Sequence, residues 1–333
     1  MSASTFHAER TAVYDPAWRA TSSPAKRPSF RFPSLTATVP KELVHRASVA
    51  EVLLTDWQRV DEARFSVTAQ WPRSHSFFTP VAGGHYDPLL CTETIRQIGS
   101  LLGHAEFAVP FGHHFLLWEL SLTVHPEHLL VGHTPATLDI DVTCTEIKKR
   151  AGRLSGLTYE SVVRRDGHVL ATGRVSYTCT SPAVYERVRP EHTLRADHRP
   201  LPLTAPTAPQ SVGRLSPTDV VLSPIGEADR WQLRVDTLHP VLFDHPVDHV
   251  PGMVLLEAAR QASAAALGRS SFLPLGIDSE FKRYVELDAP CMISAERLYQ
   301  DDLPGAQEAV RVTGRQNGEF VFGATVTAAS YAG

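Results

Sequence analysis

Hydrophobic and polar residues recur along the 333-residue chain in patterns that predict helices and strands in a set order. Residues 253–267 are apolar on nearly every side of a predicted helix, with Glu257, Arg260 and Gln261 as the large polar exceptions. A helix of this kind is typical of one that other elements surround. Four predicted strands follow it, at residues 272–285, 291–299, 308–315 and 319–328.

The same order of elements occurs earlier in the chain. A helix is predicted to begin near Asp87, as the later helix begins near Gly252, and a short alternating strand and an irregular loop precede each of them. The strands after the first helix are predicted at residues 113–124, 137–147, 156–165 and 168–179. Asp166-Gly167 provides a two-residue hairpin turn, and Asn317-Gly318 stands at the matching turn. One helix followed by several antiparallel strands predicts an α+β fold in which a curled sheet wraps a long helix.

Polar residues repeat along with the elements, at one constant offset of 164 residues. His75, His85, Glu93, Arg96 and Gln97 correspond in this way to His239, His249, Glu257, Arg260 and Gln261. The Glu, Arg and Gln of each helix stand at i, i+3 and i+4, which places them on one face. Charge on an apolar helix is unfavourable unless it is paired, so the repeat indicates either buried ion pairs that fix the packing of two halves or a functional site. Because histidines stand just upstream in both copies, we favour the site.

The repeat divides the chain into an N-terminal extension (residues 1–43), a first repeat (44–180), a linker (181–217) and a second repeat (218–333). The extension is rich in Ser, Pro, Arg and Thr but lacks the apolar core of a secretory signal, so we expect it to be partly disordered. Seven prolines in the linker leave little room for a helix or a central strand.

The composition is that of a folded soluble protein, with 43% hydrophobic and 20% charged residues. A net charge of −4 provides no general attraction to nucleic acid, and no run of 18 apolar residues that could span a membrane occurs in the sequence. The four cysteines are scattered, as expected for buried thiols in a reducing cytoplasm. His245 and His249 stand near aspartates, but Pro246 keeps them off one helical face, so neither a metal nor another cofactor is expected.

The segment from His249 to Gln261 is similar to the central-helix motif of hot-dog proteins such as β-hydroxyacyl-carrier-protein dehydratases, in which Pro-Gly precedes a helix bearing Glu and, four residues later, Gln. The tandem arrangement of residues 85–97 and 248–262 resembles the A-factor synthase family more closely, over roughly residues 44–330. The resemblance implies a double hot-dog, with two antiparallel sheets that each wrap a long central helix and are related by a pseudo-two-fold axis.

The resemblance to the A-factor synthase family also implies an activity. Its members are acyltransferases that move a β-ketoacyl group from an acyl carrier protein to the hydroxyl of dihydroxyacetone phosphate, which gives a phosphorylated β-ketoester precursor of a γ-butyrolactone signalling molecule. Water elimination is less well supported, because the position that matches His245 in the first copy is Val81. A hot-dog thioesterase or hydratase and a non-catalytic acyl-ligand-binding regulator remain alternatives, and the protein can be a monomer or a homodimer.

Roles for individual residues follow from this reaction. We predict Glu93 to be the general base or the group that orients the base, with His249 as the alternative base. Arg260 is predicted to bind the phosphate, because a guanidinium matches phosphate oxygens and stays charged. Gly252 opens the second helix, where backbone N–H groups can approach the thioester carbonyl. The remaining substrate-binding candidates are His85, Arg96, Glu257 and Gln261.

The two copies are predicted to be functionally unequal and to share one cavity. Asp87-Pro88 at the start of the first helix is a poorer oxyanion site than Pro251-Gly252, because proline lacks an N–H and aspartate adds negative charge. In hot-dog dimers the helix of one unit lies beside the upstream loop of the other, so Glu93 and Arg260 are expected to converge on that cavity. No covalent acyl-enzyme is expected, since Cys91 lies inside a predicted buried helix and no G-x-S-x-G elbow is present.

Overall fold

A computed structural model of the chain describes residues 36–189, 199–298 and 307–329. Thr38–Gly333 form one compact unit. Most of the predicted N-terminal extension, residues 1–35, lies outside the described residues, and so does the disorder expected there. Of the helices in the described part of the chain, none combines the length with the apolar character that crossing a bilayer requires.

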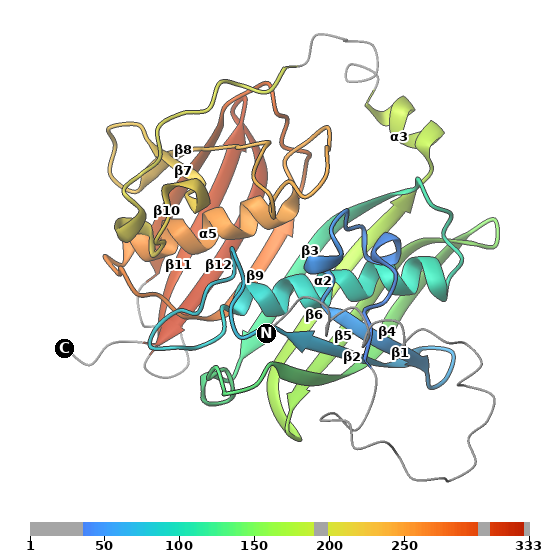
Figure 1. The fold of residues 1–333 in the computed structure, drawn as a ribbon. Coiled ribbons are helices and arrows are strands. Elements are labelled where there is room, and N and C mark those ends of the chain that lie inside the picture. Colours follow the sequence, from blue (N-terminus) through green and yellow to red (C-terminus); the bar gives the residue numbers. More distant parts are fainter. Residues whose placement is uncertain (1–35, 190–198, 299–306, 330–333) are drawn as a thin grey trace, which may run out of the picture. The chain divides into compact units, whose positions relative to one another are not determined.

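A single antiparallel sheet of twelve strands dominates the described residues (Figure 1). The strands are β1 (Leu54–Arg59), β2 (Arg64–Trp71), β3 (His114–Val124), β4 (Ala136–Arg150), β5 (Arg153–Arg165), β6 (His168–Thr180), β7 (Leu222–Pro224), β8 (Arg230–Leu233), β9 (Pro274–Phe281), β10 (Cys291–Leu298), β11 (Gln307–Gln316) and β12 (Glu319–Ala329). The α-helices are α2 (Pro88–Ala105), α3 (Pro182–Val188) and α5 (Gly252–Ala266). Short 3₁₀-helices are η2 (Lys41–Val44), η3 (Val49–Glu51), η4 (Pro126–His128), η5 (Pro209–Val212) and η6 (Pro217–Asp219).

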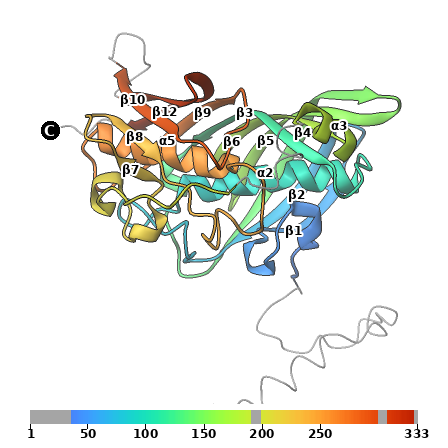
Figure 2. The same ribbon diagram turned by 90° about the horizontal axis from the view of Figure 1, so that it is seen from above.

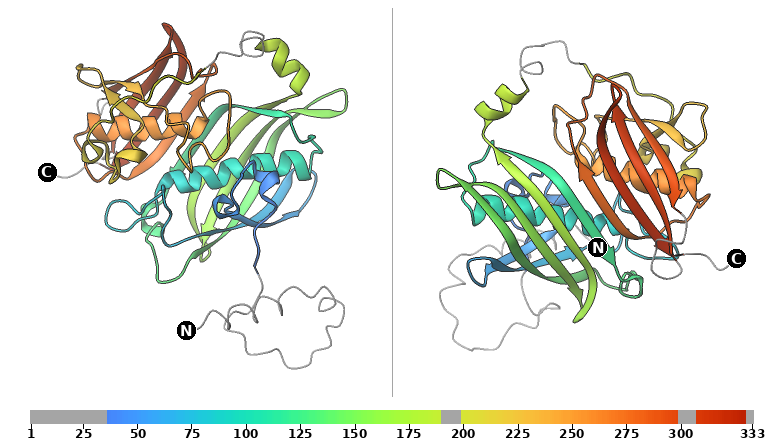
Figure 3. Two further views of the ribbon diagram at one scale, coloured as in Figure 1. Left: turned by 45° about the horizontal axis from the view of Figure 1, so that its top comes forward. Right: turned by 180° about the vertical axis from the view of Figure 1, so that it is seen from behind.

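The two halves of the sheet have the same strand order in opposite directions. The order is β1-β2-β4-β5-β6-β3 in the first half and continues as β9-β12-β11-β10-β8-β7 in the second. The halves meet where β3 pairs with β9, with Leu120 opposite Ser279 and Leu122 opposite Ile277. Each half curls around its own helix, and from behind the strands of both halves cover α2 and α5 (Figures 2 and 3). The predicted double hot-dog is confirmed, and its two half-sheets are joined edge to edge into one sheet, which satisfies strand edges that would otherwise stay unpaired.

Burial explains the apolar composition of the two central helices. Leu89 and Leu90 in α2 and Leu256 in α5 are fully buried, and each such side chain stabilises the fold by roughly 2 kcal/mol relative to exposure. The helices begin differently. Oδ1 of Asp87 caps α2 by accepting a hydrogen bond from the N–H of Leu89 (2.9 Å), whereas Pro251 precedes α5 without a side-chain cap. The start of α5 therefore keeps backbone N–H groups free of a capping side chain.

The predicted linker contains structure that its prolines did not suggest. Helix α3 lies inside it, so the prediction that it leaves little room for a helix was wrong. Pro182 occupies the first helical position, where the missing N–H has no intrahelical partner to lose. Farther along, the N–H of Thr207 donates to the carbonyl of Leu222 (2.8 Å), and η5 and η6 repeat η2 and η3 at an offset of 168 residues, from Lys41 to Pro209. The second copy therefore begins inside this segment, ahead of residue 218.

Candidate active site

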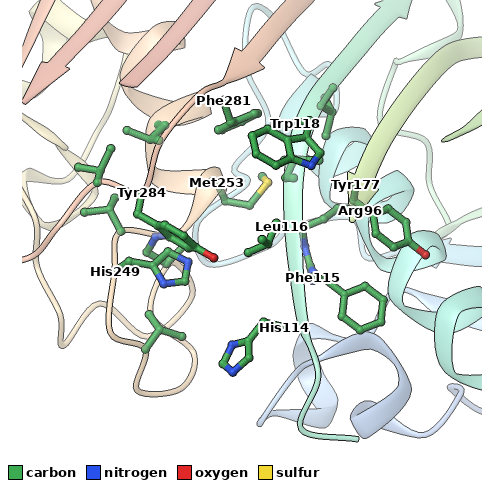
Figure 4. Close-up of a pocket in the computed structure, with 18 of the residues that line it drawn as sticks. Arg96, His114, Phe115, Leu116, Trp118, Tyr177, His249, Met253, Phe281 and Tyr284 are labelled. Atoms are coloured by element: carbon green, nitrogen blue, oxygen red, sulfur yellow. The ribbon is translucent and has the colours of Figure 1, made fainter. Parts of the chain in front are cut away.

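A cavity of about 1030 Å³ lies where the two halves meet (Figure 4). Its walls come from α2, β3, β5 and β6 of the first half and from the start of α5, β9 and the loop before α5 of the second. Polar side chains in the wall include His45, Arg46, Arg96, Asp244, His249 and Tyr284. Apolar side chains include Phe115, Leu117, Leu120, Val175, Met253, Leu255 and Phe281. An apolar cavity with a few converging polar groups is typical of a small-molecule site.

Glu93 holds two arginines at the wall of this cavity. Its carboxylate accepts hydrogen bonds from Nε and Nη2 of Arg96, both at 2.8 Å, and from Nε of Arg46 at 3.1 Å. Nη2 of Arg46 forms an ion pair with it at 2.6 Å, and the Gln97 amide donates to it at 2.8 Å. Glu93 is buried, whereas 24% of the Arg96 side chain is exposed and faces the cavity.

This arrangement argues against Glu93 as the general base. Burial raises the pKa of a carboxyl, but the charges of Arg46 and Arg96 outweigh it and hold the pKa of Glu93 at about 2. A carboxylate this acidic and this fully bonded is a poor proton acceptor near neutral pH. Its geometry suits the other predicted role, that of an orienting group, although the groups that it orients are the two arginines.

Glu93, Arg96, Gln97 and Arg46 form a first cluster, and the equivalent second cluster, Glu257, Arg260, Gln261 and Arg214, is closed off from the cavity. Glu257 accepts hydrogen bonds from Arg214 (2.7 Å from both Nε and Nη2), from Arg260 (3.0 Å from Nε and 2.7 Å from Nη2) and from Gln261. Glu257, Arg260 and Gln261 are fully buried, and none of them lines the cavity. As with Glu93, burial raises the pKa of Glu257, and its two arginines more than reverse this, to about 2.

The predicted convergence of Glu93 and Arg260 on one cavity is therefore wrong. Each helix carboxylate is neutralised by the arginine three residues later and by a second arginine from the segment that opens its own half, Arg46 or Arg214. The halves still interlock, because Nη1 of Arg46 donates to the carbonyl of Val241 (3.3 Å) and Nη1 of Arg214 to that of Phe77 (2.7 Å). The glutamate of each central helix is thus paired with arginines of its own half, and the same arginines reach backbone carbonyls of the other half.

Asp87 helps to explain why only one cluster opens to the cavity. It stands where the second copy has Pro251, it is fully buried, and its Oδ2 lies 3.9 Å from Nη1 of Arg214. An internal carboxylate thus faces the second cluster. The second-half carboxylate near the first cluster is that of Asp244. It accepts hydrogen bonds from the N–H groups of Ala47 (2.6 Å) and Ser48 (3.2 Å) instead. The two copies are structurally unequal.

His249 lies in the cavity wall beside Tyr284, with 4.9 Å between the ring centroids (Figure 4). Its Nδ1 is 2.7 Å from Oδ1 of Asp248. The equivalent residue of the first copy, His85, bonds through Nδ1 to the carbonyl of Ala82 (2.6 Å) and does not line the cavity. Of the predicted site residues, the structure brings together Arg96, His249 and Gly252 at this cavity, with Glu93 directly behind Arg96.

Gly252 is the first residue of α5 and borders the cavity. A Cβ at this position would lie 3.4 Å from the ring of Phe281 and 3.5 Å from Leu117, so a side chain here would fill space next to the helix N-terminus. The absence of a side-chain cap on α5 leaves its first N–H groups and the positive end of the helix dipole directed at this space. A carbonyl oxygen that gains negative charge would be stabilised there.

One arm of the cavity runs between α2 and the first half-sheet. Gly99 of α2 borders it, and the rings of Tyr159 and Tyr177 stand opposite. Their hydroxyls donate to helix carbonyls, Tyr159 to Ile95 (2.7 Å) and Tyr177 to Gly99 (2.8 Å), which ties helix to sheet. Tyr159 is fully buried and Tyr177 is 5% exposed, so the accessible part of the Tyr177 ring gives this arm an apolar surface that suits an alkyl chain.

His45, Arg46 and Asp248 are site residues that the sequence did not identify. Nε2 of His45 lies 2.6 Å from Nε2 of His104, and burial, with help from the nearby Arg96, lowers the pKa of His45 to about 3. Arg46 was missed because its equivalent, Arg214, stands 168 residues later. The second copy is four residues shorter between this segment and its histidine loop, so a search at the single offset of 164 passes over the pair.

Neither a thiol nor a metal cluster stands out among the described residues. Cys91, Cys144, Cys179 and Cys291 are free, and Cys91 is fully buried in α2 away from the cavity. Over the described ranges, no three or more His, Cys, Asp or Glu side chains are grouped as metal ligands would be. His245 and His249 each pair with the aspartate that precedes them.

The chain is similar to known proteins over most of its length. A family profile described as A-factor biosynthesis hotdog domain matches residues 30–181 and 196–331. A 2-oxo-3-(phosphooxy)propyl 3-oxoalkanoate synthase of Streptomyces virginiae is 56% identical over 288 residues, which cover 86% of this chain and 96% of the relative. A synthase of the same name from Streptomyces coelicolor is 42% identical over 295 residues, 89% of this chain and 93% of the relative. Among solved structures, a Lactobacillus plantarum protein described as an oleoyl thioesterase has a TM-score of 0.52 at 10% identity, covering 82% of this chain and 98% of that chain, a likeness of fold alone.

Proposed function

Because the chain belongs to the A-factor biosynthesis hotdog domain family, we propose that it is an acyltransferase that makes a 2-oxo-3-(phosphooxy)propyl 3-oxoalkanoate. The acyl donor is a β-ketoacyl thioester of an acyl carrier protein, and the acceptor is the hydroxyl of dihydroxyacetone phosphate. One observation carries the proposal. A guanidinium, an imidazole and an uncapped helix N-terminus border a single apolar cavity.

The phosphate of the acceptor binds at Arg96. The guanidinium of Arg96 is partly exposed in the cavity, and Glu93 holds it in place through two hydrogen bonds. A guanidinium oriented in this way presents its remaining N–H groups to phosphate oxygens. Arg46 adds a second positive charge behind it. Arg96 thus takes the role predicted for Arg260, whose side chain is enclosed by its own cluster.

The thioester carbonyl binds at the start of α5. Its oxygen points at the first N–H groups of the helix, next to Gly252, where negative charge that develops during attack is stabilised. The acyl chain extends along the apolar walls of the cavity. In this proposed pose the carbonyl carbon lies between the helix N-terminus and the imidazole of His249, because both groups border the cavity.

His249 is the general base. Its Nδ1 is engaged by Asp248, so its Nε2 is the nitrogen that can take the hydroxyl proton as the alcohol oxygen attacks. The C–O bond forms, the tetrahedral intermediate collapses with cleavage of the C–S bond, and the protonated imidazole returns the proton to the departing thiolate. Ester and free carrier thiol are the products, and no covalent bond to the enzyme is needed.

The carrier protein, dihydroxyacetone phosphate and a cytoplasmic location belong to this proposal together. The relatives' shared name describes a product that contains a phosphorylated three-carbon unit and a 3-oxoalkanoyl chain. Joining these two parts through an ester requires an activated acyl group and a phosphorylated alcohol. Both are metabolites of the cytoplasm, which also suits the free cysteines.

The decisive experiment incubates the protein with a β-ketoacyl carrier protein, with and without dihydroxyacetone phosphate, and follows the products by mass spectrometry. We expect a phosphorylated β-ketoester that appears only when the acceptor is present, together with free carrier thiol. Equally fast release of the free acid in both reactions would identify a thioesterase instead. Intact thioester in both reactions would favour a ligand-binding protein.

A further inference from the structure

Asp248 lies at the centre of a network that ends in the imidazole of His249. Its Oδ1 is 2.7 Å from Nδ1 of His249. The hydroxyl of Tyr185 donates to both of its oxygens, at 2.9 and 2.8 Å, and Nη1 of Arg189 donates to Oδ2 at 3.0 Å. Three donors from two segments of the chain therefore meet on one carboxylate.

The contacts of Asp248 fix the tautomer of His249. An ionised carboxylate can only accept hydrogen bonds, so Nδ1 of His249 carries the hydrogen that lies between them. In the neutral ring Nε2 is then the acceptor. Burial raises the pKa of Asp248. The hydrogen bond with His249, then that from Tyr185 and the charge of Arg189, lower the pKa by more than burial raises it, so the carboxylate remains ionised.

Helix α3 places two of these donors. Tyr185 is buried, although it belongs to a helix of only seven residues between the two repeats. Its ring stacks on that of His114 at the start of β3, with centroids 3.6 Å apart and planes 6° apart. Arg189 follows the helix, lies over the ring of Tyr284 at 4.1 Å and forms an ion pair with Glu286. The helix is thus held against both halves at the edge of the cavity.

We propose that Asp248, supported by Tyr185 of the inter-repeat helix α3, is the positioning residue that holds the base His249 in its reactive tautomer. The inference rests on the proposed function for the base itself. It gives the connection between the repeats a role in the chemistry. The arrangement of the reacting groups is then a property of the tandem chain, because α3 lies in the segment that connects the two repeats.

Asp248→Asn is the informative substitution. Asparagine keeps the size of the side chain, but its amide can donate a hydrogen bond to Nδ1 and so favour the opposite tautomer of the ring. We expect kcat to fall at least tenfold while KM for dihydroxyacetone phosphate stays within about twofold, since Arg96 is unchanged. Tyr185→Phe removes only one donor and should lower kcat less. Asp219→Asn provides the matched control, because Asp219 also contacts a histidine, His239 (3.4 Å), away from the cavity, and should leave kcat unchanged.

A spectroscopic readout separates positioning from general stability. In protein labelled with ¹⁵N-histidine, the ring signals of His249, assigned with His249→Gln, should show a protonated Nδ1 in the wild type and a shift toward protonated Nε2 in Asp248→Asn. Asp248→Glu should restore part of the rate. Circular dichroism of each variant verifies folding, and Tyr185→Phe supplies the test if Asp248→Asn fails to fold.

Failure of this inference and failure of the proposed function give different results. Wild-type protein without transferase activity would contradict the function, whereas the tautomer of His249 would still be measurable. Active wild type with an Asp248→Asn variant of unchanged kcat, or a ¹⁵N spectrum in which His249 keeps one tautomer in both proteins, would overturn the role of Asp248 and leave the function standing.

Discussion

Arg96 and Arg260 stand at equivalent positions of the two central helices, yet only Arg96 reaches the cavity. Each pairs with the glutamate three residues before it, and the exposed fraction of the side chain is 24% for Arg96 and 0% for Arg260. The same sequence motif therefore serves as a cavity wall in one half and as an enclosed ion pair in the other. Comparing the two arginines within one molecule therefore shows what exposure to the cavity adds to the role of the side chain.

Substituting these two arginines should separate binding from stability. Arg96→Gln should raise KM for dihydroxyacetone phosphate about 10- to 100-fold, because a charge-assisted contact to phosphate contributes roughly 1.5–3 kcal/mol. Arg260→Gln should leave KM unchanged but lower the free energy of unfolding by about 3–5 kcal/mol, as expected when one partner of a buried ion pair is removed. Steady-state kinetics and urea unfolding of both variants provide the measurements. A normal KM in Arg96→Gln, or a raised KM in Arg260→Gln, would indicate that the phosphate binds at Arg260, as the sequence predicted, and not at Arg96.

The two helix carboxylates should make stability depend on acid pH. The pKa of Glu93 and that of Glu257 are held at about 2, below the ordinary value of 4.5, so the folded state binds fewer protons than the unfolded state between these values. Their contribution to stability is complete above about pH 4.5 and is lost as the pH falls toward 2. Urea unfolding measured from pH 6 down to pH 3 should show this loss. Glu257→Gln, although less stable at pH 6, should lose less stability over the same range, and an unchanged slope would contradict the assignment.

The two central helices, the strands and the repeated polar residues could be predicted from the sequence. Helix and strand periods are local patterns, and most of the repeat keeps one fixed offset. The sequence could not reveal that Glu93 binds Arg46, since the opening segment of each copy is displaced by four residues relative to the rest of the repeat. It could not reveal either that Glu257 binds Arg214, because Arg214 was counted as part of a linker. Asp248 was inconspicuous because its donors, Tyr185 and Arg189, come from a segment whose prolines predicted no helix. Such contacts depend on tertiary packing, which one sequence does not encode in its periodicity.

Cys91 should be dispensable for acyl transfer. Its side chain is fully buried in α2, it does not line the cavity, and burial raises the pKa of its thiol, so little nucleophilic thiolate is present. Cys91→Ala should therefore keep kcat within about twofold of the wild type, with a modest loss of stability from the missing sulfur. The rate of ester formation and the intact mass of the protein after incubation with acyl carrier thioester provide the measurements. An acyl adduct on Cys91 would require a two-step mechanism.

Tyr177 should limit the length of the acyl chain. Its ring borders the arm between α2 and the first half-sheet, where the hydroxyl donates to the carbonyl of Gly99 at 2.8 Å and the ring lies against Phe115 with centroids 5.3 Å apart. Tyr177→Ala should enlarge this arm and shift the preferred donor to longer chains, and it should lower the free energy of unfolding by about 3–5 kcal/mol. Competition among β-ketoacyl carrier thioesters of increasing length, with product masses as the readout, measures the preference.

Tyr177→Phe is the matched control for chain length, because it removes the hydroxyl and keeps the ring. It should cost about 1 kcal/mol of stability and leave the preferred chain length unchanged. If Tyr177→Ala folds and retains the preference of the wild type, the chain does not enter this arm. The apolar surface of Met253 and Phe281 on the second half would then be the wall that accepts it, since these residues border the same cavity beside the N-terminus of α5. Met253→Trp would test that route, with the opposite expectation of a shift to shorter donors.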